Sequence, residues 1–291
     1  MVIEPRRAAG WPALALLLNA FVWGISWWPF RWLQGQGLHP LWATVLIYAL
    51  AVLVISLLHP GAWRELFSTP VLWLLVLASG TTNASFNWGI TVGDVVRVVL
   101  LFYLMPMWAA LLARPLLGER FTWPAAARTL MALAGAAIVL WPPGGGWPLP
   151  RTLAEWLGVL GGFTFALNNV MLRREAARSS GARALAMFLG GTLVAGLSAL
   201  VLSSQGLVPA PPPLALPWMT GALAMGALFL GGNMALQFGA ARLPSSVTAV
   251  VMITEVLFAS VSTVLLGAGV VTPGLLAGAA LILGATLWSA L

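Results

Sequence analysis

Several polar side chains of this sequence interrupt long apolar stretches, where neither lipid nor a protein core can solvate them. Six of them are amides: Asn83, Asn87, Asn168, Asn169, Asn233 and Gln237. Asn83 and Asn87 are four residues apart and share one face of a helix, and Asn233 and Gln237 repeat that spacing. Because amides both donate and accept hydrogen bonds, they suit a zwitterion that must be bound and then released. The alternative is hydrogen bonding between packed helices.

Glu255 is the acid that lies deepest within an apolar stretch. A carboxylate at the centre of a membrane helix costs roughly 2.5–3.5 kcal/mol on insertion scales, so we expect this side chain to face the protein interior. Two functional roles fit such a group: pairing with a substrate ammonium, or binding and releasing a proton. The alternative is a structural acid, protonated or hydrogen-bonded beside Thr254.

Three aromatic residues lie away from the expected ends of their stretches: Trp23, Tyr103 and Trp108. Their rings could stack on an aromatic or cationic ligand, and packing in the core or against lipid is the alternative. Pro106 lacks a backbone N–H, which predicts a kink that can act as a hinge. Asp94 and Arg97 are three residues apart, which predicts a surface ion pair or an external gate.

The elements that must position these residues are apolar segments long enough to cross a bilayer. Sixty per cent of the residues are hydrophobic and 7% are charged, which excludes a water-soluble domain. Crossing about 30 Å of hydrocarbon takes roughly 20 residues. Apolar runs broken by charges, prolines and glycines give ten such segments: about 12–33, 40–58, 71–92, 95–114, 121–141, 156–173, 184–204, 218–240, 244–266 and 272–290. We therefore predict an all-α membrane protein with ten transmembrane helices.

The arginines predict the orientation of these helices. All 14 basic residues are arginines, and with the N-terminus inside the cell only Arg31, Arg97 and Arg151 face outward. This asymmetry follows the positive-inside rule, so both the N- and C-termini are expected in the cytoplasm. The net charge of +7 then reflects orientation in a membrane and not binding of nucleic acid.

The membrane pattern occurs twice. The stretch 104–124 returns as 253–273 after a constant shift of 149 positions, so that Pro124 matches Pro273. Each copy carries five segments, an odd number, which turns the second copy upside down relative to the first. We expect a first repeat over 1–141, a periplasmic Pro/Gly-rich linker over 142–155 and a second, inverted repeat over 156–291. Inverted repeats around a central site are typical of secondary transporters.

The two copies resemble the EamA repeat of the drug/metabolite transporter superfamily, which has a proline about a dozen residues before a Leu-Leu-Gly-Glu ending. The first copy has Pro106 and then Leu116-Leu117-Gly118-Glu119. The second copy departs from this pattern, with Glu255 in place of the proline and Ala268 in place of the closing glutamate. The stretch 93–104 is most similar to the bacterial aromatic amino-acid exporters of the YddG type. This resemblance implies export of amino acids across the bacterial inner (cytoplasmic) membrane.

We therefore expect a secondary transporter that exports amino acids, aromatic ones favoured, by alternating access around a cavity between the repeats. The first alternative is an exporter or facilitator of another metabolite or of a cationic drug. An intramembrane enzyme is less consistent with a chain that has no cysteine and whose two histidines, His39 and His59, lie at opposite ends of one segment. The expected partners are a small-molecule substrate and the lipid bilayer, without cofactor, metal or nucleic acid. The sequence leaves the oligomeric state open.

Overall fold

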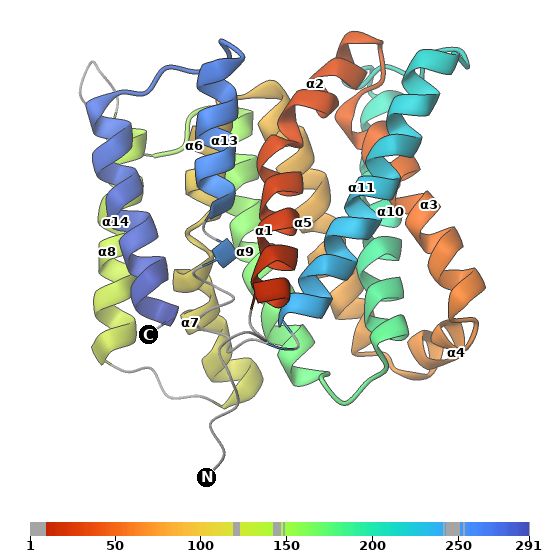
Figure 1. Ribbon diagram of the computed structural model, residues 1–291, viewed down its shortest axis with the longest axis horizontal. Helices are drawn as coiled ribbons and strands as arrows, with labels where there is room; N and C mark the ends of the chain where they lie inside the picture. Colours follow the sequence, from red (N-terminus) through yellow and green to blue (C-terminus); the bar gives the residue numbers. More distant parts are fainter. Residues whose placement is uncertain are drawn as a thin grey trace.

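The protein is built from helices packed side by side in an upright bundle (Figure 1). The computed structural model describes residues 10–118, 123–141, 147, 149–240, 242, 251–252 and 254–290. All regular structure among these residues is helical, with bounds α1 Gly10–Ile25, α2 Trp27–Gly35, α3 Pro40–Leu58, α4 Gly61–Ser68, α5 Leu72–Val92, α6 Val95–Phe102, α7 Met105–Leu117, α8 Trp123–Leu140, α9 Leu153–Arg174, α10 Ser180–Ser204, α11 Leu216–Ala240, α13 Thr254–Leu265 and α14 Pro273–Ala290. The α-helical class predicted from the sequence is thus observed.

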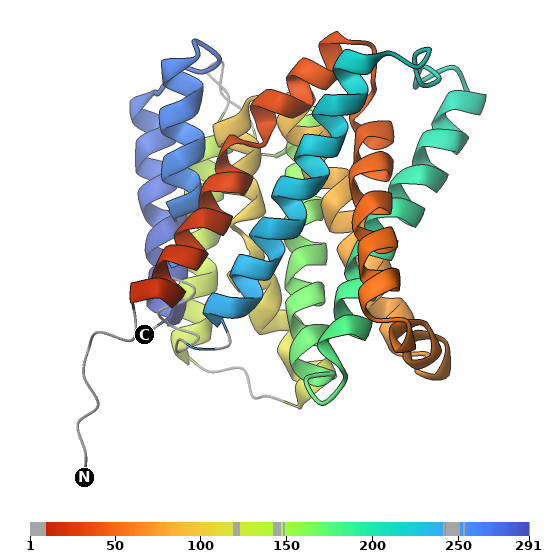
Figure 2. The same cartoon turned by 45° about the vertical axis from the view of Figure 1, so that its right-hand side comes forward.

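The packing brings helices from the two halves of the chain together. The helix α5 packs on α9 and α10, while α11 packs on α1 and α3. The helices α8 and α14 form a pair at one edge of the bundle, and α1 and α11 run side by side across one face (Figure 2). The first described helix begins, and α14 ends, at the same end of the bundle, the lower one in Figure 1. Below, the lower and upper ends are those of Figure 1.

Several helices are long and apolar enough to cross a bilayer. Within the described residues these are 10–35, 40–58, 180–204 and 216–236, and a fifth candidate combines α4 and α5 with a bend of 105° between them. The predicted segment 40–58 coincides with α3, and 71–92 differs from α5 by one residue. Part of the predicted segment 244–266 lies outside the described residues.

Two predicted segments are each divided into two helices. Segment 12–33 becomes α1 and α2, which are separated at Ser26. Pro29 has no N–H to offer the carbonyl of Ile25, and the Ser26 hydroxyl donates to the Trp23 carbonyl at 2.7 Å, so the helical ladder is interrupted here. Segment 95–114 becomes α6 and α7, which are separated by a turn at Tyr103 and Leu104.

The outer surface is apolar and polar side chains are buried, the reverse of a soluble protein. Leucines on several helices are largely exposed: Leu18, Leu53, Leu197 and Leu223. Buried polar side chains include Asn19, Thr44, Ser79, Thr82, Asn83, Asn87, Asn168, Glu255 and Thr263. Because hydrocarbon offers no hydrogen-bond partners, such groups are tolerated in a membrane only when they face other protein groups or water.

Glycines allow the central helices to approach until their backbones touch. A β carbon placed on Gly80 of α5 would lie 2.3 Å from the carbonyl oxygen of Gly190 in α10, and one on Gly190 would lie 2.1 Å from the Val76 carbonyl oxygen. A β carbon on Gly24 of α1 would lie 2.8 Å from the carbonyl oxygen of Glu255 in α13. These two crossings therefore require glycine, as in small-residue packing motifs of membrane helices.

The α5–α10 crossing yields a stability prediction. Gly80→Ala should lower the free energy of unfolding by about 1–3 kcal/mol, because overpacking forces the two backbones apart. Gly231→Ala is the matched control, since nothing lies within 4 Å of a β carbon at that exposed position. Thermal unfolding in detergent measures both variants. Equal melting temperatures for the two would contradict the backbone contact.

Candidate functional site

A small cavity of about 40 Å³ lies between helices from both halves of the chain. Its lining residues come from α1, α3, α5, α10 and α11: Trp23, Tyr48, Ser79, Asn83, Met187, Phe188, Phe229 and Asn233. None of these side chains carries a formal charge. A volume of this size holds a few water molecules, whereas pockets for small-molecule ligands measure roughly 300–1,000 Å³. The bundle must therefore open before a metabolite can enter this cavity.

Hydrogen bonds orient the polar side of the cavity. The Tyr48 hydroxyl donates to the side-chain oxygen of Asn83. The amide nitrogen of Asn83 donates to the Ser79 carbonyl at 2.7 Å, and the Ser79 hydroxyl donates to the Met187 carbonyl at 3.2 Å. These hydrogen bonds link α3, α5 and α10, and they fix the orientation of the Asn83 amide relative to the cavity.

Aromatic rings form the other side of the cavity and continue beyond it. Trp23 stacks on Phe229, with ring centroids 4.6 Å apart and planes 19° apart. Trp23 also contacts Phe86 edge to face, Phe86 contacts Phe102, and Phe102 contacts Tyr103. Neighbouring rings therefore form a continuous path from the cavity to the turn between α6 and α7.

Tyr103 and Glu255 meet at the end of this path. Both side chains are buried, and the Tyr103 hydroxyl lies 2.9 Å from the carbonyl oxygen of Met252 and 3.3 Å from Oε2 of Glu255. Tyr103 belongs to the first half of the chain, and Met252 and Glu255 belong to the second. Positions 103 and 252 are also related by the 149-residue shift of the repeated sequence. The carboxyl group predicted to face the interior thus lies at a contact between the two halves.

Other candidate residues lie apart from the cavity lining. Asn87 is fully buried, and its amide donates to the Thr44 hydroxyl at 3.0 Å. Asn168 is buried in α9 and donates to the side chain of Asn169, which is itself exposed. Trp108 contacts Phe163 edge to face at a centroid distance of 5.4 Å. The side chains of Gln237 and Pro106 lie outside the described part of the structure.

The backbone of Pro106 is described even though its side chain is not. Pro106 is the second residue of α7 and directly follows the turn at Tyr103 and Leu104. Since N–H groups in the first turn of a helix have no intrahelical acceptor, proline costs no hydrogen bond there. It therefore marks the start of a new helix after a break.

Several residues of the site were not among those singled out from the sequence. Tyr48, Ser79 and Phe229 line the cavity. Asn19 is buried in α1 and donates to the Met252 sulfur at 3.5 Å. For Tyr48 a signal existed, because it is one of two tyrosines and lies in the middle of segment 40–58.

Polar contacts join the two halves at the upper end of the bundle. Arg97 pairs with Glu155 at 3.2 Å, beside a cleft of about 470 Å³ lined by 92–94, 97–98 and 152–155. Asp94, considered above as an ion-pair partner of Arg97, accepts a hydrogen bond from the Arg97 backbone N–H and caps α6. The Trp42 indole donates to the Pro209 carbonyl at 3.1 Å. We favour the smaller central cavity as the site, because the charged groups of the cleft pair with each other and with helix termini.

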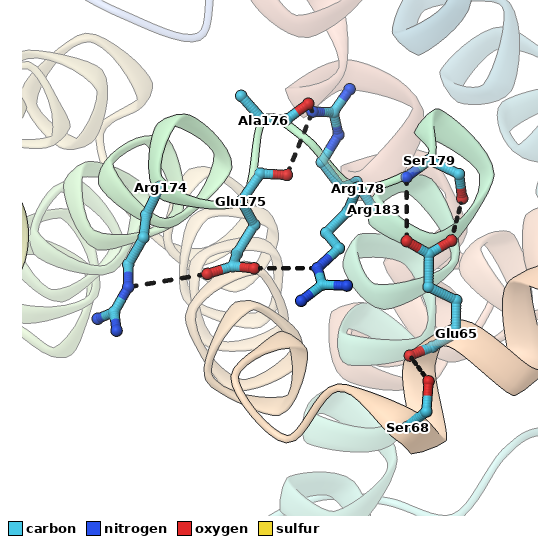
Figure 3. A network of polar contacts seen from close by, with 8 residues as sticks. All are labelled: Glu65, Ser68, Arg174, Glu175, Ala176, Arg178, Ser179 and Arg183. Carbon is cyan, nitrogen blue, oxygen red and sulfur yellow. Dashed lines mark hydrogen bonds and ion pairs between the residues drawn. The ribbon is translucent and has the colours of Figure 1, made fainter.

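At the lower end, α4 contacts the start of α10. The Glu65 carboxylate accepts hydrogen bonds from the Ser179 hydroxyl and backbone N–H, and these bonds hold the pKa of Glu65 below its ordinary value (Figure 3). Glu175 lies between Arg174 and Arg178 in the same region (Figure 3). No group of three or more potential metal ligands occurs among the described side chains.

His39 caps the upper end of α3 and gives a pH-dependent prediction. Its Nδ1 accepts a hydrogen bond from the Leu41 N–H, and burial lowers its pKa from 6.5 to about 4. Between pH 6.5 and 4 the imidazole of His39 is protonated in the unfolded chain but stays neutral in the folded protein. Proton binding therefore favours the unfolded chain, and the free energy of unfolding falls as the pH drops from 6.5 to 4. His39→Asn keeps a capping acceptor without titrating.

Melting temperatures in detergent at pH 7, 6, 5 and 4 test this. The wild type should lose more stability between pH 6.5 and 4 than His39→Asn does. Identical pH profiles for the two proteins would mean that His39 is not held neutral.

The apolar outer surface of the helix bundle and the hydrogen-bonded polar side chains at its centre are those of a multi-pass α-helical membrane protein. The sequence profile of the EamA-like transporter family matches residues 10–141. The chain is also 30% identical over 176 residues to a protein described as the uncharacterized transporter PA0485 of Pseudomonas aeruginosa. That match covers 58% of this chain and 48% of the relative, so it spans about half of the relative's length.

One solved crystal structure resembles the protein over nearly its whole length. It covers 98% of this chain and 97% of its own, with a TM-score of 0.58 and 18% sequence identity. At this identity the similarity concerns the fold alone. The profile match shows that the part of the chain over residues 10–141 is similar to the EamA-like transporter family.

Proposed function

We propose that this chain is a secondary transporter that exports amino acids, aromatic ones favoured, or similar small metabolites across the bacterial inner membrane. The observation that carries the proposal is the central cavity, which both halves of the chain line. Its amides, Asn83 and Asn233, offer donors and acceptors to a zwitterionic headgroup, and its rings, including the stacked Trp23 and Phe229, suit a planar apolar side chain.

The proposed architecture is ten membrane-spanning helices in two inverted repeats, 1–141 and 156–291, joined by the periplasmic linker 142–155, with both termini in the cytoplasm. The packing supports this: if each helix is exchanged for its repeat partner, the pairs α5–α9 and α5–α10 become α11–α1 and α11–α3, which also pack. The pairs α8–α14 and α3–α10 map onto themselves. Such exchange is what a two-fold relation between halves produces.

Alternating access then requires the two ends of the bundle to open one at a time. Contacts between the halves close each end: Arg97–Glu155 and Trp42–Pro209 above, Glu65–Ser179 below. These contacts are polar and partly exposed, so each is weak and readily exchanged with water. Pro106 at the start of α7 is the proposed hinge, because the backbone ladder is already interrupted just before it.

The alternative substrate is another metabolite or a cationic drug. Cation-binding sites usually supply a carboxylate, and the described lining of the cavity contains none. Glu255 lies along the aromatic path from the cavity and could provide that charge. Competition by neutral, zwitterionic and cationic aromatic compounds separates these substrate classes.

The test is counterflow of labelled tryptophan in proteoliposomes. Asn83→Ala and Asn233→Ala should each weaken the apparent affinity about tenfold, because one hydrogen bond to a charged group contributes about 1.5–3 kcal/mol. Gln205→Ala is the matched control, since it removes an exposed amide at the end of α10.

Membrane insertion and melting temperature must be checked for each variant. Wild-type counterflow in both asparagine variants would remove the cavity from the transport path. No counterflow of any amino acid by the wild type would contradict the proposed substrate class.

A further inference from the structure

At the contact between Tyr103 and Glu255, hydrogen-bond acceptors outnumber the protons that the Tyr103 hydroxyl can donate. The Tyr103 hydroxyl carries one proton, and two acceptors lie within reach of it: the Met252 carbonyl at 2.9 Å and the Glu255 carboxyl at 3.3 Å. Among the described side chains, Tyr103 is the hydrogen-bond partner of Glu255. A tyrosine hydroxyl can donate only once, although it can also accept.

These contacts are satisfied together when Glu255 is protonated. The carboxyl O–H then donates to the Tyr103 oxygen, and the Tyr103 O–H donates to the Met252 carbonyl. If the carboxyl proton leaves for water, the carboxylate needs a donor, and the Tyr103 hydroxyl must turn toward it. The Met252 carbonyl then loses the hydrogen bond from Tyr103, which joins the first and second halves of the chain.

The surroundings make both forms of Glu255 accessible. Burial disfavours the charged form, whereas the Tyr103 hydroxyl can donate a hydrogen bond to it. The helices with the most extensive packing on α13 are α1, which has no titratable side chain, and α6, whose Arg97 is six residues before Tyr103 and pairs with Glu155. The helix α2 also contacts α13, through a hydrogen bond from the Trp27 indole to the Ser262 hydroxyl, and its Arg31 donates to the Thr91 and Gly93 carbonyls. Tyr103 is thus the titratable group that faces Glu255 in the described structure.

We propose that Glu255 is a proton-binding site, and that Tyr103 transmits its protonation to the contact between the two halves. The inference rests on the proposed transport function and adds the coupling ion: a proton binds Glu255 on one side of the membrane and leaves on the other as substrate moves the opposite way. The aromatic path from Tyr103 through Phe102 and Phe86 to Trp23 connects this site to the cavity. A change at the contact can therefore alter the cavity through touching side chains.

The first experiment measures proton movement driven by a tryptophan gradient, using a pH-sensitive dye trapped in proteoliposomes. The wild type should move protons against the tryptophan flux. Glu255→Gln should reduce this proton flux at least tenfold while tryptophan counterflow persists, because the glutamine amide donates to Tyr103 as the protonated acid does. Tyr103→Phe should also reduce proton flux. Glu175→Gln, which removes a half-buried carboxylate that pairs with Arg174 and Arg178 at the lower end of the bundle, should match the wild type.

The second experiment needs no substrate. Infrared difference spectra of the purified protein should contain a protonated-carboxyl band that disappears on raising the pH, is absent from Glu255→Gln, and has a shifted midpoint in Tyr103→Phe. Absence of tryptophan counterflow in the wild type would count against the proposed transport function, and this titration would still judge the proton site. Wild-type proton flux in Glu255→Gln, or a carboxyl band that is missing or unchanged at every pH, would overturn the proposal.

Discussion

The structure depends on one constraint: hydrocarbon cannot supply a hydrogen bond, so every polar group at the depth of the membrane must find its partner within the protein. Within each helix the backbone N–H and C=O groups form hydrogen bonds with one another. The polar side chains cannot do so alone. Tyr48, Ser79, Asn83 and Asn233 collect between α1, α3, α5, α10 and α11, while leucines such as Leu53 and Leu197 cover the outside. The central cavity therefore lies where the amides and hydroxyls can find hydrogen-bond partners away from lipid. Its position between the two halves of the chain makes it suitable for transport.

Close helix approach and polar partnering act together around this cavity. Gly80 and Gly190 bring α5 and α10 into backbone contact, which places Ser79 within reach of the Met187 carbonyl. At the other crossing, Gly24 brings α1 against the backbone of Glu255. The first crossing supports the binding cavity and the second supports the Tyr103–Glu255 contact. A rigid-body movement of the halves would act on both sites, since touching aromatic rings connect them.

Much of the helical framework could be predicted from the sequence, because hydropathy directly reports which segments lipid can surround. Segment 40–58 coincides with α3, and the ends of most other described helices lie within a few residues of the predictions. The break at Ser26 was missed, since apolar character continues through it, whereas the break at Tyr103 and Leu104 directly precedes the helix turn in which a kink at Pro106 was predicted. The interior position of Glu255 followed from the cost of exposing a carboxylate to lipid. Its tyrosine partner could not be predicted, nor could the roles of Tyr48 and Phe229, because periodicity does not determine which helix faces are neighbours.

Asn83 and Asn233 are proposed to face a shared, hydrated space and not lipid. The chain contains no cysteine, so a single cysteine introduced at either position, or at Leu223 on the exposed face of α11, is the only thiol that a reagent can label in the protein. Reaction of each with a small water-soluble thiol reagent in intact membranes is the measurement. The cysteines at 83 and 233 should react, and tryptophan should slow their reaction, while the cysteine at 223 should stay unreactive. Reaction at 223 alone would contradict this placement.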